Sequence, residues 1–144
     1  MIDFLYPILF NTSVLIALTF LHFFWLIGGK TGLKYAFPHN SKHRNKIYRP
    51  RTIVLFFTTL ILAVMAWFCL ALTDSFNNVF DNETIRWGNR ISGIIFLARS
   101  VGNFRYVGLT KTFKNTEFAQ LDTYVYCPLF LIMAICAFIS TLHF

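Results

Sequence analysis

Four long apolar segments are the feature of this sequence that most constrains its fold. They cover about residues 4–27, 52–73, 85–109 and 123–142, and each is close to the roughly 20 residues that an α-helix needs to cross a bilayer. The 144 residues are 56% hydrophobic and 19% aromatic, far more apolar than an ordinary soluble domain. The sequence therefore predicts an all-α, polytopic membrane protein, in which four transmembrane helices form one bundle and one domain over residues 1–144.

The charged side chains are divided unevenly between the loops, and this predicts the orientation. The net charge is +7, and the loop 28–51 carries Lys and Arg but no acid. The next loop instead holds Asp74, Asp81 and Glu83. By the positive-inside rule, loop 28–51 should be cytoplasmic and both termini outside. Its cations could also bind anionic lipid head groups, whereas the lack of an aromatic stacking motif argues against a nucleic-acid partner.

The sequence contains no clear motif for a redox-active disulfide or a metal site. Cys69, Cys127 and Cys136 lie in apolar segments without a CxxC pattern, so we interpret them as small buried residues. His39 and His43 have helical spacing, but they lie among cations without a carboxylate, which disfavours a metal site. We expect neither a metal nor a cofactor.

The first segment lacks a basic leader and a cleavage site, so we expect a retained helix rather than a signal peptide. Its inward stripe contains Asn11, Leu15 and His22, with Trp25 close by on the helical wheel. Two interpretations of His22 stay open, a ligand contact or a core histidine bonded to a carbonyl of a neighbouring helix. Trp25 could likewise contact a ligand or lie in the aromatic belt at the membrane interface.

Arg99 lies deep inside the third segment. A guanidinium costs a few kcal/mol at the centre of a bilayer, so such an arginine usually faces the bundle interior, a water-filled cavity or an anionic partner. On the helical wheel, one polar face that should be buried joins Arg99 to Gly88, Ser92, Asn103 and Tyr106. Arg105 points about 120° away and is interpreted as an interfacial cation.

The last segment begins with Asp122, for which two roles stay open. The carboxylate could cap the helix N-terminus, or it could pair with Arg99 or Arg105. Tyr126 follows one turn later, and Pro128 predicts a kink in the first turns of this helix.

Three motifs in order resemble those of an uncharacterised bacterial family of small four-helix integral membrane proteins, catalogued as a domain of unknown function. The motifs are His22-x-x-Trp25-x-x-Gly28-Gly29, Arg99-x-x-Gly102-x-x-Arg105-Tyr106-x-Gly108 and Phe118-x-x-Leu121-Asp122-x-x-x-Tyr126-x-Pro128-Leu129. The resemblance covers nearly the whole chain and implies a bacterial inner-membrane location. Asn103 departs from the family pattern, where an aspartate is often expected, and this removes one acid that could pair with an arginine.

Helical rise places the polar residues of three segments in the cytoplasmic half of the membrane. Polar groups in hydrocarbon are costly unless they satisfy one another. We therefore predict an inward-open pocket, in which Arg99 meets an anion and aromatic side chains hold an apolar tail. The predicted lining is His22, Trp25, Arg99, Asn103, Tyr106, Asp122 and Tyr126.

The function that this pocket favours is binding, sensing or moving a small anionic or amphiphilic, lipid-like molecule without catalysis. A second hypothesis is a membrane enzyme acting on a lipid or isoprenoid, with His22 as general acid or base and Arg99 stabilising negative charge. No nucleophile–base pair in the sequence supports it. A third is an accessory or immunity-type partner of another membrane protein, and a homo-oligomer is also left open.

Overall fold

The computed structural model describes residues 2–37, 50–73, 80–102, 108–109 and 117–142. These ranges form helices and contain no strand, which confirms the all-α prediction. Spans long and apolar enough to cross a membrane are Leu5–Leu26, Thr52–Leu70 and Phe118–Leu142. The elements are α1 (Ile2–Leu26), α2 (Leu33–Ala36), α3 (Thr52–Leu70), α4 (Asn82–Val101), α5 (Glu117–Leu121), the π-helical turn η3 (Asp122–Tyr126) and α6 (Cys127–Leu142).

The third predicted segment differs from the structure at both ends. Instead of running from 85 to 109, α4 begins after Asp81, which caps it by accepting from the Thr84 amide, and ends at Val101. Hydrogen bonds from the hydroxyl and amide of Thr84 also lower the pKa of Asp81. Gly102 ends the helix because it adopts φ 85°, a conformation that glycine tolerates and other residues avoid. Four charged side chains in α4 also keep it outside the set of apolar spans.

The last helical run begins earlier than predicted, at Glu117 instead of residue 123. Asp122–Tyr126 form a π-helical turn, in which the Cys127 amide donates to the Asp122 carbonyl five residues back. Pro128 comes two residues after this turn. Proline lacks an N–H group, and in a regular α-helix its ring collides with the carbonyl four residues earlier. The wider π turn thus lies where the sequence predicts a kink.

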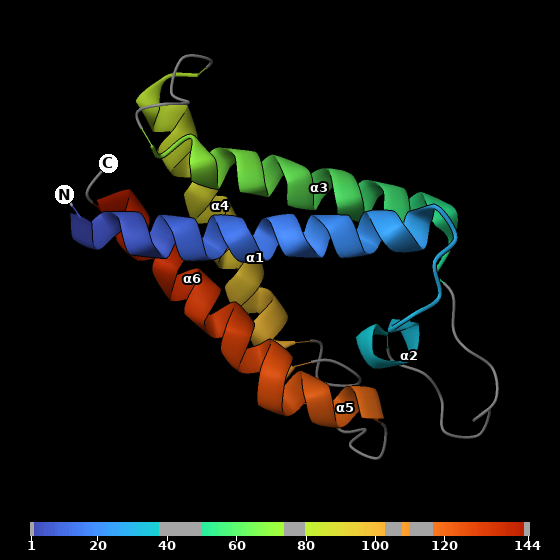
Figure 1. Ribbon diagram of the computed structural model, residues 1–144. Coiled ribbons are helices and arrows are strands. Elements are labelled where there is room, and N and C mark those ends of the chain that lie inside the picture. The colour runs from blue at the N-terminus through green and yellow to red at the C-terminus, as the bar shows by residue number, and fades with distance from the viewer. Residues whose placement is uncertain (1, 38–49, 74–79, 103–107, 110–116, 143–144) are drawn as a thin grey trace.

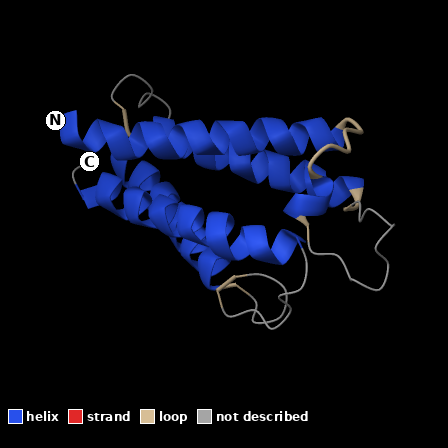
Figure 2. Ribbon diagram, turned by 60° about the horizontal axis from the view of Figure 1, so that its bottom comes forward, coloured by secondary structure: helices blue, strands red, loops and turns tan. Residues whose placement is uncertain are grey.

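Two pairs of helices make up the bundle (Figure 1). Helices α1 and α3 lie side by side, α4 packs along α6, and α1 joins the pairs by contacting α6. The N- and C-terminal ends lie close together, and from that end α1 and α6 diverge in both views (Figures 1 and 2). At the far end the short helix α2 lies between α1 and α5, the helix that leads through η3 into α6, and Leu33 of α2 packs with Trp25 of α1.

Polar side chains link the helices at several depths, as is common in membrane bundles. The Asn11 amide on α1 donates to the carbonyl of Met133 on α6, at 2.9 Å. Asn89 on α4 donates to the Phe68 carbonyl on α3, at 2.7 Å. In both bonds a side-chain amide donates to a backbone carbonyl of another helix. The bonds therefore link neighbouring helices without interrupting the helical backbone of either.

Candidate functional site

The centre of the candidate site is an ion pair between α4 and η3. Nη2 of Arg99, in the last turn of α4, donates to Oδ1 of Asp122 at 2.9 Å. The Asp122 side chain is fully buried, whereas that of Arg99 is 28% exposed. The pairing predicted as one role for Asp122 is therefore confirmed. Its other role, a helix N-cap, is wrong, because Leu121 before it is already helical and the run continues from Glu117.

The second carboxylate oxygen of Asp122 binds a glycine amide. The Gly108 N–H donates to Oδ2 at 2.7 Å, and the Cys127 thiol lies 3.8 Å from the same oxygen. Gly108 adopts φ 96°, and the next amide, of Leu109, donates to the Ser100 carbonyl at 3.1 Å. The chain therefore returns to the end of α4 after leaving it, and a backbone dipole joins Arg99 in stabilising the buried charge.

The π-helical turn holds Asp122 in place from the other side. The Ser100 hydroxyl of α4 donates to the Cys127 carbonyl at 3.0 Å, and both side chains are buried. π-helical turns are rare and occur frequently at functional sites. The Arg99–Asp122 pair lies where α4, η3 and the backbone at Gly108 meet.

Arg99 keeps donor capacity beyond this pair. Its Cζ lies 5.2 Å from the centre of the Phe130 ring, a cation–π contact that a partly desolvated guanidinium favours. Its Nη1 is buried and has no hydrogen-bond partner among the described residues. A buried donor without an acceptor costs about 1–3 kcal/mol, so an acceptor oxygen placed beside this nitrogen would form a favourable hydrogen bond.

His22 and Trp25 form a separate group at the end of α1. His22 Nδ1 lies 2.8 Å from the Leu18 carbonyl oxygen of its own helix, not from a neighbouring helix as one interpretation held. The His22 and Trp25 rings meet edge to face at 5.0 Å. The indole N–H of Trp25 donates to the Thr31 carbonyl at 2.8 Å, and the side chain is 2% exposed. This burial excludes the lipid-facing belt position for Trp25.

Tyr126 links the Arg99–Asp122 end of the bundle to α2. Its hydroxyl donates to the Tyr35 carbonyl at 3.1 Å, and its ring packs near Phe118. An open cleft of about 380 Å³ lies beside it, lined by Tyr35, Gln120, Leu121 and Tyr124. The lining of this cleft therefore offers aromatic and amide groups, and of its four residues only Leu121 belongs to a motif that the sequence analysis quoted.

Of the predicted pocket residues, the structure joins Arg99 to Asp122 and His22 to Trp25, on helices that diverge with α2 between them. Asn103, Tyr106 and residues 38–49 of the basic loop lie outside the described residues. A single pocket lined by all seven residues stays a prediction. Sequence reasoning missed Gly108 and Phe130 as partners of the pair, although the second motif contains Gly108, and glycine in a motif often marks a positive φ angle.

Comparison with known proteins gives one finding. A family model described as "Protein of unknown function (DUF3995)" matches residues 15–137, a stretch that includes the Arg99–Asp122 pair, η3 and most of α6. No curated protein matches the chain, and no solved structure does. Because the match covers well over half of the 144 residues, the chain belongs to the DUF3995 family of proteins of unknown function.

Proposed function

We propose that this protein binds a small anionic or amphiphilic, lipid-like molecule in the cytoplasmic half of the bundle, and senses or moves it without catalysis. The observation that carries the proposal is Nη1 of Arg99, which is buried and has no acceptor among the described residues. A carbonyl, ester or phosphate oxygen of a ligand would be such an acceptor. Because Asp122 already balances the charge of Arg99, an amphiphile with an acceptor oxygen fits better than a fully buried free anion.

The cleft beside Tyr126 supports this proposal. Its volume of about 380 Å³ falls at the lower end of the range for small-molecule sites. Tyr35 and Tyr124 supply aromatic faces and Gln120 supplies an amide that can donate and accept. Such a lining suits a molecule with a polar head and an apolar tail.

Ligand retention tests the proposal. The protein would be purified in mild detergent and its retained small molecules identified by mass spectrometry. In Arg99→Met/Asp122→Asn both charges are gone, but an amide oxygen at position 122 can still accept from Gly108. We expect this variant to retain the molecule about tenfold less, the factor for roughly 1.4 kcal/mol of lost hydrogen bonding. Arg99→Lys should restore retention only in part, because an ammonium lacks the planar fork of donors.

The matched control is the exposed pair of Arg86 and Glu83, whose side chains are 32% and 64% exposed. Arg86→Met, which breaks this pair but leaves Glu83 in place, should retain as much ligand as the parent. Equal retention by the parent and by Arg99→Met/Asp122→Asn would refute binding at Arg99. A stoichiometric protein partner in place of a small molecule would instead support the accessory role.

We also propose a bacterial inner-membrane location with both termini outside the cytoplasm. The cations of loop 28–51 support this orientation, and the two chain ends lie at the same end of the bundle (Figure 1). Reporter fusions after Phe144 should therefore show alkaline phosphatase activity and no GFP fluorescence. Fluorescent GFP at that position would reverse the orientation.

A further inference from the structure

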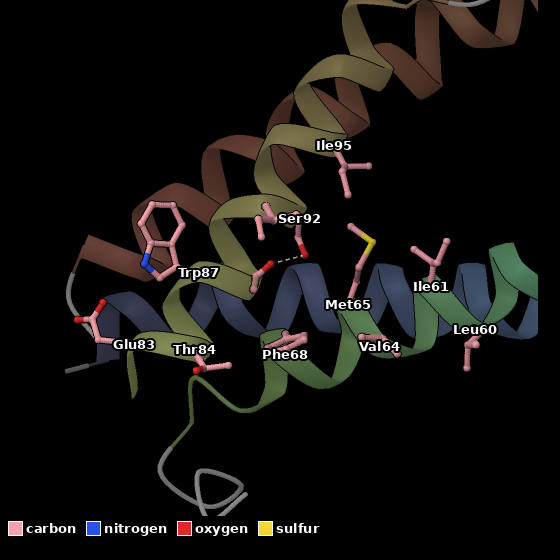
Figure 3. Close-up of a pocket in the computed structure, with 12 residues that line it drawn as sticks. Leu60, Ile61, Val64, Met65, Phe68, Glu83, Thr84, Trp87, Ser92 and Ile95 are labelled. Carbon is pink, nitrogen blue, oxygen red and sulfur yellow. Dashed lines mark hydrogen bonds between the residues drawn. The ribbon is translucent and has the colours of Figure 1, made fainter. Parts of the chain in front are cut away.

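An apolar groove of about 600 Å³ lies between α3 and α4 (Figure 3), and neither Arg99 nor Asp122 is among the residues that line it. Its walls include Ile61, Val64 and Phe68 of α3 and Trp87, Ile91 and Ile95 of α4. Most of these side chains are exposed in the isolated chain; Ile91, for example, is 52% exposed. In a membrane, this groove would open toward lipid, since α3 is one of the apolar spans.

The groove exists because α3 and α4 touch closely at only one end. Phe68 packs onto Gly88, where a β-carbon would collide with its ring, and Asn89 holds the Phe68 carbonyl at 2.7 Å. Beyond this contact the two helices diverge (Figure 3). The space between them therefore follows from a fixed contact.

The charges at the groove point to one chemical class of occupant. Glu83 is the charged residue among those that line it, and Trp87 lies one helical turn further on. The Glu83 side chain is 64% exposed, and its bond to Arg86 is an i,i+3 surface pair that contributes little. Arg90 lies over the Trp87 ring, with Cζ 5.3 Å from the ring centre. An acid, an indole and an arginine together match a head group that carries both an ammonium and a phosphate.

The length of the groove agrees with a lipid chain. From Glu83 to Ile95 the α4 axis rises about 18 Å at 1.5 Å per residue, which compares with the roughly 15 Å of hydrocarbon in one leaflet. The polar groups lie at one end, and the rest is almost wholly apolar. A phospholipid has the same arrangement, with a polar head at one end and an apolar chain behind it. Its head would lie in the leaflet on the side of the chain termini.

We infer that the α3–α4 groove holds one acyl chain of a phospholipid with an ammonium-bearing head group, the ammonium at Glu83 and the phosphate near Arg90. The site is separate from the one in the proposed function. An occupant of the groove would cover the exposed apolar side chains of both helices and close the gap between the two helix pairs.

Native mass spectrometry of the full chain in mild detergent tests this inference, with phosphatidylethanolamine and phosphatidylglycerol of identical acyl chains as probes. We expect one bound ethanolamine lipid in clear preference to the glycerol lipid. Glu83→Gln should lower that preference about fivefold, the factor for one partly exposed ion pair. Ile95→Trp should weaken binding of both lipids by filling the groove. Its neighbour Ile94 does not line the groove and is 55% exposed, so Ile94→Trp should bind as the parent does.

The outcomes separate this site from the Arg99 site. Arg99→Met/Asp122→Asn should keep the groove lipid, whatever it does to the ligand of the proposed function. Equal affinity for the two lipids would overturn the head-group assignment, and equal binding by the Ile94 and Ile95 variants would overturn the groove. A dimer that only Ile95→Trp disrupts would show that a second copy of the chain occupies it instead.

Discussion

We expect Arg99→Met to lower the free energy of unfolding by about 3–5 kcal/mol, because it leaves the buried charge of Asp122 without its partner. The Asp122 carboxylate is 0% exposed, so water cannot replace the guanidinium. The Gly108 amide and the Cys127 thiol would still lie beside the carboxylate, but neither carries a positive charge. Reversible unfolding in mixed detergent micelles, followed by circular dichroism, measures the change.

A double substitution tests whether the unpaired charge of Asp122 causes this loss of stability. Arg99→Met/Asp122→Asn should recover most of the loss, since neutral replacement of a buried ion pair is often tolerated. Arg86→Met, which breaks the exposed pair with Glu83, should cost about 0.5 kcal/mol or less. If Arg99→Met and Arg86→Met cost the same, the pair at Asp122 contributes no more than a surface ion pair.

Gly108→Ala should be destabilising by about 2–5 kcal/mol, the sum of left-handed backbone strain and overpacking. Gly108 has φ 96°, and a β-carbon there would collide with the Val101 carbonyl oxygen and the Gly102 Cα. Backbone atoms cannot move aside as a flexible side chain can. Relief of the collision would also pull the Gly108 amide away from Asp122. The same unfolding measurement reports the cost.

Gly32 is the matched control for this prediction. It has a similar φ of 82°, but the nearest atom to a β-carbon would be Cζ2 of Trp25 at 3.9 Å, an ordinary contact. Gly32→Ala should therefore cost only the backbone strain, about 1–2 kcal/mol. Equal costs at the two glycines would mean that the return of the chain to α4 is not a fixed part of the folded state.

The apolar spans and the inward position of Arg99 could be predicted from the sequence. Hydrophobic length is a local property, because a bilayer of fixed thickness selects any helix that matches it. A guanidinium inside such a segment must find a partner, whatever the fold. The charges of loop 28–51 likewise predict the orientation of the chain in the membrane without knowledge of the fold. That orientation stays a prediction.

Tertiary structure alone decided the partners of Arg99. Asp122 lies 23 residues away in sequence, and the choice between Arg99, Arg105 and a helix cap depends on how α4 and η3 pack. The end of α4 was missed because glycine can continue a helix or leave it, and only the structure shows that Gly102 leaves it with a φ of 85°. Likewise, α2 lies between α1 and α5 at the end where α1 and α6 have diverged, and divergence is a property of side-chain packing that hydrophobic periodicity does not encode.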